Sequence, residues 1–288
     1  MDYKKLMKSR KSTRAYKDDK VNKKEIEELL HYFHNCKRLV PDIELEPILF
    51  IEGQEVFDKL DGIAGYNGRM IQAPSYMVMT SEVKGGYIEN TGFVVENMLL
   101  KAEELGIDTC WITFPDSLTI KEALSITSDN EVTAIFALGY GLEQKKVLHV
   151  LDTGDNYSKA DMRVVDDNTS FRYAVEDLVY NKEWGNPIDY GDLEMRGLGD
   201  TFTYARLAPS TLNSQPWKFI LDDSRLVLTI KDDADICERD ELTDAGIVML
   251  YVYLIFAETV YDLKWQLGKP SKEYEIPKDY RIVAWCTT

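Results

Sequence analysis

Residues 206–220 read Arg-Leu-Ala-Pro-Ser-Thr-Leu-Asn-Ser-Gln-Pro-Trp-Lys-Phe-Ile, and residues 38–51 repeat their outline as Arg-Leu-Val-Pro-Asp-Ile-Glu-Leu-Glu-Pro-Ile-Leu-Phe-Ile. Both segments begin Arg-Leu-x-Pro and end Pro-x-x-Phe-Ile. Only the later segment keeps a set of short polar side chains, which are Ser210, Thr211, Asn213 and Gln215. The comparison predicts a chain of two related halves, one of which has lost part of a site.

A second pair of segments supports the duplication. When Gly92 is placed over Gly246, five identities follow at the same offset of 154 residues, including Trp111 over Trp265. Both segments are apolar on most sides, as expected for helices buried on nearly all faces. The first helix, over residues 91–105, is expected to end at Gly106, because glycine adopts a left-handed conformation without steric cost. We therefore expect two central helices that pack against each other.

The remaining patterns predict an α+β fold with two related halves around these central buried helices. Residues 23–32 have helical periodicity, and short apolar strands are expected at residues 76–80, 132–138, 219–221, 226–231 and 282–286. Residues 145–175 are polar and contain repeated aspartates, which is typical of a connection. The predicted organisation is a first half over residues 1–150, a linker over 151–175 and a second half over 176–288.

Composition narrows the range of partners and compartments. A net charge of −16 argues against nucleic acid and anionic membranes as partners. The longest apolar run, residues 246–257, is too short to cross a bilayer. The four cysteines form no C-x-x-C pair, and the N-terminus lacks a signal-peptide pattern, so a cytoplasmic protein with reduced thiols and no metal site is expected.

A basic cluster near the N-terminus is the first candidate site. Ten Lys or Arg residues and only two acids lie between Lys4 and Lys24 in this acidic chain. In an extended segment Arg10, Ser12 and Arg14 point to one face, where two guanidiniums and a hydroxyl suit a phosphate. The alternative is that these charges lie on a solvated chain end and helix face and bind no ligand.

The Pro209–Trp217 loop is the second candidate site. Its neutral donors and acceptors, held between two prolines, suit the polar edge of a flat heterocycle better than a metal or a phosphate. The alternative is a hydrogen-bonded turn without a ligand.

Three motifs together resemble the FMN-dependent nitroreductase family. They are Arg-x-Ser-x-Arg-x-Tyr at 10–16, Ala-Pro-Ser-x-x-Asn-Ser-Gln-Pro-Trp at 208–217, and the helical segment of residues 92–111 with its Leu-Gly-Ile end. Leu-Gly-Tyr-Gly at 138–141 is similar to the late core strand of that family. In ordinary members two chains form a dimer, and each flavin is held by the basic motif of one chain and the Pro-Ser-x-x-Asn loop of the other.

This chain departs from the ordinary pattern because each motif is intact only once. The first half has Pro41-Asp-Ile-Glu-Leu-Glu-Pro47 in place of the polar loop, and the second half has no Arg-x-Ser-x-Arg near residues 178–188. The resemblance therefore implies a fused pseudo-dimer with one FMN per chain, similar to the tandem branch of the superfamily. A monomer is expected, although further dimerisation stays open.

The resemblance also implies a set of cofactor-binding residues from both halves. It assigns the flavin phosphate and ring edge to Arg10, Ser12 and Arg14. Asn67 and Arg69 correspond to family positions near the ring, although Asn67-Gly68 is equally typical of a plain turn. The full set is Arg10, Ser12, Arg14, Asn67, Arg69, Ile112, Thr113, Phe114, Lys145, Lys146, Pro209, Ser210, Thr211 and Asn213.

The implied activity is hydride transfer from NADH or NADPH through FMN to an electron-poor small molecule, such as a nitroaromatic, a quinone or an enone. The cofactor carries this chemistry, so no catalytic protein residue is predicted. The alternatives are a non-catalytic flavin-binding protein, a different reaction such as dehalogenation or flavin fragmentation, and an acidic interaction module.

Overall fold

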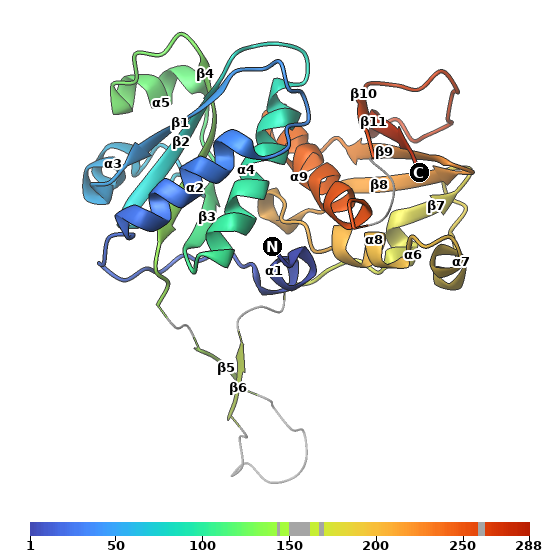
Figure 1. Cartoon of the computed structure of the whole chain (residues 1–288), viewed down its shortest axis with the longest axis horizontal. Coiled ribbons are helices and arrows are strands. Elements are labelled where there is room, and N and C mark those ends of the chain that lie inside the picture. Colours follow the sequence, from blue (N-terminus) through green and yellow to red (C-terminus); the bar gives the residue numbers. More distant parts are fainter. Residues whose placement is uncertain (143–144, 150–161, 167–169, 259–262) are drawn as a thin grey trace.

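The computed structural model describes residues 1–142, 145–149, 162–166, 170–258 and 263–288; of 145–149 and 162–166 it describes the backbone alone. Two long helices, α4 (Tyr87–Glu104) and α9 (Glu238–Phe256), lie side by side between two sheets (Figure 1). Both are buried along most of their length, which confirms the central helices expected from the sequence. Gly106 closes the first of them with a φ of +77°.

The two sheets share one strand order. The first sheet runs β1-β2-β4-β3 and the second runs β8-β9-β11-β10, with β7 added beyond β8. Each of the four corresponding strands occupies the same place along its half of the chain, before or after its central helix. This topological repeat confirms the two related halves. The strands are β1 (Leu45–Phe50), β2 (Ser75–Ser81), β3 (Asp108–Ile112), β4 (Glu131–Gly139), β7 (Val179–Asn181), β8 (Trp217–Asp222), β9 (Arg225–Lys231), β10 (Gln266–Leu267) and β11 (Tyr280–Thr287).

All neighbouring strands in these sheets are antiparallel except β7, which pairs with β8 in parallel. The five strands expected from apolar runs are all present. Strand β1 differs from expectation because it includes Pro47, which the sequence assigned to a loop. The proline is accommodated because β1 lies at the edge of the sheet, where one side needs no ladder hydrogen bond.

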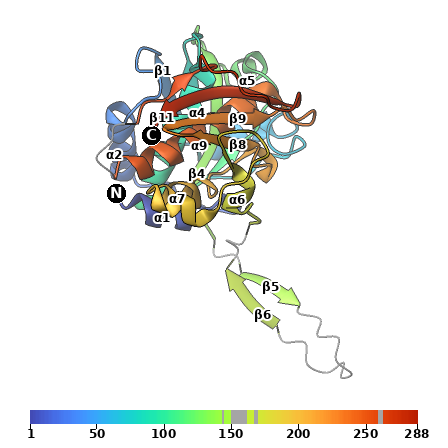
Figure 2. The ribbon, with the colours of Figure 1, turned by 90° about the vertical axis from the view of Figure 1, so that its right-hand side faces the viewer.

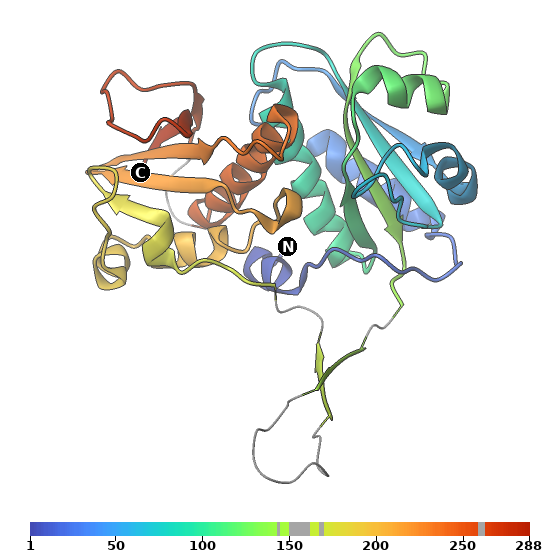
Figure 3. The same cartoon turned by 180° about the vertical axis from the view of Figure 1, so that it is seen from behind.

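Shorter helices surround this framework. Helix α2 (Lys23–Asn35) packs on α4 and is capped by Asn22, whose side chain accepts a hydrogen bond from the Lys24 amide at 2.9 Å. Helix α1 (Tyr3–Ser9) reaches across to α8 (Gly199–Ala205) of the second half (Figure 3). The others are α3 (Gly53–Leu60), α5 (Ser117–Leu124), α6 (Val175–Leu178), α7 (Tyr190–Met195) and the short 3-10 helix η1 (Thr211–Asn213).

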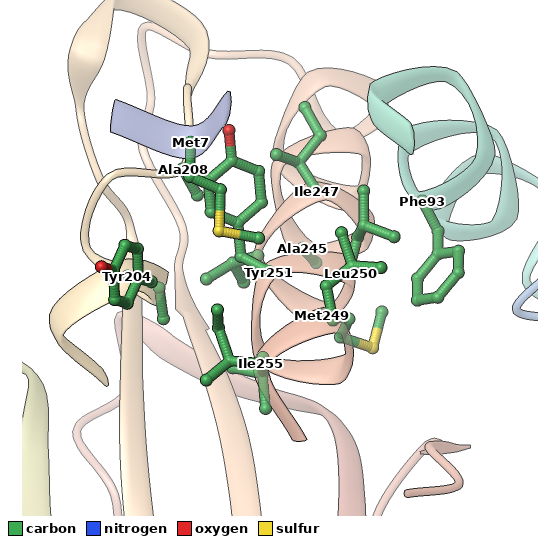
Figure 4. Close-up of a cluster of buried hydrophobic side chains, with 14 of the residues drawn as sticks. Met7, Phe93, Tyr204, Ala208, Ala245, Ile247, Met249, Leu250, Tyr251 and Ile255 are labelled. Carbon is green, nitrogen blue, oxygen red and sulfur yellow. The ribbon is translucent and has the colours of Figure 1, made fainter. Parts of the chain in front are cut away.

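One hydrophobic core joins the halves. It contains Phe93 and its neighbours from α4, Met7 from α1, and α9 residues including Met249, Tyr251 and Ile255 (Figure 4). A second, smaller cluster lies on the other face of the first sheet, beneath α3 and α5. Between the halves, β5 (Lys145–His149) and β6 (Met162–Asp166) pair as an antiparallel ribbon (Figure 2). The shared core makes the junction between the halves a packed interior.

Candidate functional site

The basic motif is fixed along the edge of the first sheet. Ser12 forms a parallel bridge with Thr109 of β3, and the Thr13 amide donates to the Thr109 carbonyl at 3.0 Å. The Thr13 hydroxyl donates to the Asp108 carboxylate at 2.9 Å. These contacts hold the segment extended after α1, as the alternating pattern predicted. They also bring its first residue, Arg10, to the junction of the two central helices.

Arg10 enters a buried polar network centred on Glu96 of α4. Its Nε lies 2.8 Å from Glu96 Oε1, and the exposed fractions of the two side chains are 5% and 0%. Trp111 Nε1 donates to Glu96 Oε2 at 2.8 Å, and the Tyr251 hydroxyl of α9 donates to Oε1 at 3.1 Å. Although burial opposes it, the charge of Glu96 raises the pKa of Arg10. The guanidinium is therefore charged in the protein interior.

The polar loop of the second half has a strained backbone. Leu212, Asn213 and Gln215 all have positive φ angles, of 55°, 57° and 50°. Such conformations cost non-glycine residues of order 1–3 kcal/mol each and persist only where surrounding contacts enforce them. Here Gln215 is 3% exposed and anchors the loop, since its amide accepts from the Tyr173 N–H and donates to the Phe171 carbonyl. Strain of this kind is typical of binding loops.

The polar loop is also bound by Arg172, a residue that the sequence did not single out. Arg172 donates to the Asn213 side-chain oxygen and, at 3.3 Å, to the Leu207 carbonyl. Asn213 in turn donates to the Phe171 carbonyl at 3.1 Å. The amide of Asn213, which the resemblance assigned to the flavin, thus binds Arg172 in the structure. Arg172 escaped notice because it follows a polar stretch with no periodicity and carries no motif.

Arg10 of the basic motif and Arg172, which binds the polar loop, influence each other electrostatically. Burial lowers the pKa of Arg172, and the nearby positive charges of Arg10 and Arg206 lower it further. Tyr251 and the charge of Glu96 oppose this lowering of the Arg172 pKa. The positive charges of Arg10, Arg172 and Arg206 therefore act together in this region, and an anionic ligand would offset them.

Asp244, a buried acid of α9, holds the Pro209–Trp217 loop through the Thr211 amide. Both oxygens of Asp244 of α9 accept from the Thr211 amide, at 3.1 and 3.0 Å. Burial raises the pKa of Asp244 well above its usual range, and Asp240 and Glu241 add to the effect. Asn90, which lies 154 residues earlier, does the same for the first half: its side-chain oxygen accepts from the Val40 amide at 2.9 Å. Each half therefore ties the chain, within or just after its Arg-Leu-x-Pro segment, to the same position of its central helix.

The segment of Ile112, Thr113 and Phe114 lies at the end of β3, next to the second half. The Gly65 amide donates to the Thr113 carbonyl at 2.7 Å, which joins this segment to the turn that carries Asn67 and Arg69. Arg239 of α9 stacks on the Phe114 ring at 3.7 Å and donates to the Phe114 carbonyl at 2.5 Å. The segment after β3 and the Asn67–Arg69 turn are thus held together, next to the start of α9.

Asn67 and Gly68 form a tight turn, with φ angles of 53° and 73°, as type I′ turns require. The side chains of Asn67 and Arg69 are exposed. Arg14 is also exposed and lines an open cleft of about 450 Å³ with Lys17, Lys20 and their neighbours. Lys145 and Lys146 lie in β5, whose side chains are outside the described part of the structure.

The residues brought together fit a phosphorylated heterocycle. Nη2 of Arg10 is buried and, among the described residues, has no hydrogen-bond partner. Phe171 and Leu212, next to the arginines, expose 68% and 55% of their surface, which provides apolar area for a flat ring. Pro209, Ser210 and Thr211 lie within the same strained loop. The donor set is cationic and amide-rich, as an FMN phosphate and ring edge require.

Among the described residues, no helix is long and apolar enough to cross a membrane. In the same residues no group of three or more His, Cys, Asp or Glu side chains is arranged to hold a metal ion.

Comparison with known proteins identifies the family. Residues 2–255 match a family model described as "Putative TM nitroreductase". No curated protein matches the sequence. A crystal structure from Thermotoga maritima, described as a putative nitroreductase, is 17% identical, with a TM-score of 0.57 over 100% of this chain and 94% of that chain.

Two shorter proteins of known structure each match about half of this chain. An FMN-dependent nitroreductase from Clostridium difficile is 24% identical over 49% of this chain and 88% of its own, with a TM-score of 0.41. A nitroreductase family protein from Clostridium novyi is 21% identical over 49% and 87%, with a TM-score of 0.43. The match of the family model to most of the chain shows that this protein belongs to the nitroreductase-like family.

Proposed function

We propose that the protein is an FMN-dependent oxidoreductase with one composite flavin site per chain. The observation that supports the proposal is that the charge of Arg10, from the intact basic motif, acts on Arg172, which donates to Asn213 in the intact loop of the other half. Family membership supports an oxidoreductase. The arginine cluster, which consists of Arg10, Arg172 and Arg206, supports a phosphate-bearing cofactor.

Residues from both halves would hold the cofactor. Arg10 and Arg172 are suited to the phosphate, because guanidiniums bind its oxygens in a fork. Ser12 pairs with Thr109 of β3 and Arg14 lies two residues further on, while Thr113 and Phe114 follow that strand next to the Asn67–Arg69 turn. We assign these residues to the ring edge. From the second half, Pro209, Ser210, Thr211 and Asn213 complete the site, with Asn213 acting through Arg172.

Bound FMN would supply hydride transfer between a nicotinamide and an electron-poor acceptor. The protein would contribute orientation and positive charge, which favours a cofactor that gains negative charge on reduction. NADH or NADPH is the proposed donor, and a nitroaromatic, quinone or enone is the proposed class of acceptor.

Titration with FMN tests the proposal directly. We expect purified protein to quench flavin fluorescence and to saturate at about one FMN per chain, because each half retains only half of a site. Saturation at two would contradict the composite site, and no binding would refute the flavoprotein.

Anaerobic addition of NADH or NADPH then separates an enzyme from a carrier. Bleaching of the flavin absorbance is expected for the oxidoreductase, whereas a bound flavin that neither nucleotide bleaches would identify a non-catalytic flavin-binding protein. Light scattering on the same sample tests the proposed monomer, whose mass is 33.1 kDa.

A further inference from the structure

Glu96 is an isolated acid in the apolar interior of α4. Its side chain is fully buried, and a buried carboxylate is tolerated only when charge and hydrogen bonds compensate for lost hydration. Three groups do so: Arg10 through an ion pair, and Trp111 and Tyr251 through hydrogen bonds. The Tyr251 ring lies on the side of α9 that faces α1, so the second half closes the network (Figure 4).

The internal repeat shows that the fold itself does not require an acid at the position of Glu96. At the matching offset of 154, Trp111 corresponds to Trp265, and Glu96 corresponds to Leu250. Trp265 donates to the backbone carbonyl of Met249 at 3.0 Å, so the second half packs its tryptophan against its helix without an acid. Packing of sheet on helix therefore does not require Glu96.

The acid occurs in the half that also keeps the basic motif. The second half lacks both the Arg-x-Ser-x-Arg sequence and an acid at the matching helix position. Glu96 Oε1 lies 2.8 Å from Nε of Arg10 in an ion pair, and among the described residues neither Nε nor Nη2 of that guanidinium has a hydrogen-bond partner. The acid thus holds the charge of the guanidinium in the interior, while its buried N–H donors remain available to a ligand.

We propose that Glu96 is a positioning residue of the flavin site, which orients Arg10 toward the anionic cofactor and offsets part of its charge. This inference rests on the proposed FMN site. The carboxylate holds the guanidinium from within the core, and the remaining N–H groups face the ligand. Because Glu96 also adds one negative charge, it opposes the gain of negative charge that accompanies flavin reduction.

Glu96→Gln tests the charge effect with little change of shape. Its flavin should be easier to reduce, and we expect a shift of about tenfold in the reduction equilibrium, or ~30 mV for a two-electron couple. The matched control is Glu103→Gln, which removes the same charge from the same helix about two turns away and should cause a much smaller shift. A potential for Glu96→Gln equal to that of the control would overturn the proposal.

The double variant Arg10→Met with Glu96→Gln tests positioning while removing both buried charges. Replacing a whole buried pair by groups of similar volume is commonly tolerated, so the apoprotein should unfold near the wild-type temperature. We expect its Kd for FMN to rise at least tenfold. A wild-type Kd in this folded variant would show that the pair is only a structural support. Failure of the wild-type protein to bind FMN would instead refute the proposed function itself.

Discussion

Gly92 of α4 and Gly246 of α9 contact each other's helix in a reciprocal way. A Cβ on Gly92 would lie 2.3 Å from the carbonyl oxygen of Thr243, and one on Gly246 would lie 2.1 Å from that of Glu89. Thr243 and Glu89 are themselves 154 residues apart, as are the two glycines. The central helices therefore cross about a point of approximate two-fold symmetry, at which backbone meets backbone.

This crossing predicts that Gly92→Ala and Gly246→Ala are both strongly destabilising. Each methyl group would strike a backbone carbonyl that cannot rotate away, and overpacking of this kind costs about 1–3 kcal/mol or more. Urea unfolding measures the loss. Gly85→Ala is the control, because no atom lies within 4 Å of its Cβ position. Equal stability of all three variants would contradict the close crossing.

Asp244 predicts a pH dependence of stability. Because burial raises its pKa in the folded protein, the folded state binds a proton more tightly than the unfolded state. Its contribution is therefore greatest below the unfolded pKa of about 3.9 and is lost as the pH rises through the folded pKa. Asp244→Asn should flatten this part of the stability profile and stabilise the protein at neutral pH, since the equivalent Asn90 accepts the same kind of amide hydrogen bond.

The reverse substitution, Asn90→Asp, provides the matched control. It places an acid at the corresponding buried position of the first half, so stability should fall more steeply with rising pH than in the wild type. Thermal unfolding between pH 5 and pH 8 compares the three proteins. A parallel profile for Asp244→Asn and wild type would mean that Asp244 does not take up a proton on folding.

We expect Arg172→Ala to weaken FMN binding without unfolding the protein. A charge-assisted hydrogen bond contributes about 1.5–3 kcal/mol, so FMN affinity should fall roughly 10- to 150-fold. Stability of the apoprotein should change little, because the side chain is half-buried and is repelled by Arg10 and Arg206. Isothermal titration against the exposed-site control Arg196→Ala measures the difference. Similar affinities of the two variants would remove Arg172 from the site.

Leu212→Asn predicts a more stable protein with a weaker site. Leu212 holds a left-handed conformation, which costs roughly 1–2 kcal/mol for most residues and less for asparagine. Up to ~1 kcal/mol of unfolding free energy should be gained, while loss of the exposed apolar side chain should weaken FMN binding. Leu118→Asn, at an exposed helical position, is the control and should gain no stability. A loss of stability in Leu212→Asn would show that the loop is not strained.

Much of the fold was predictable because its signals are local or repeated. Apolar runs gave β2, β4, β8, β9 and β11, and the offset of 154 gave the pairing of the two central helices. Strand β1 was missed because Pro47 argues against a strand until the strand is known to lie at a sheet edge. Glu96 had a signal, since it is an acid within the most apolar part of a central helix, but its partner was not evident from the chain.

The sequence by itself determined the duplication, the α+β class and the complementary loss of one motif from each half, because these are patterns along the chain. Tertiary structure alone decided which side chains meet. It committed Arg10 to Glu96 and Asn213 to Arg172, and it brought Arg172 from a segment without a motif into the arginine cluster. The physical reason is that charge balance and hydrogen-bond partners depend on distances between segments far apart in the chain, which only the packing of α4 against α9 establishes.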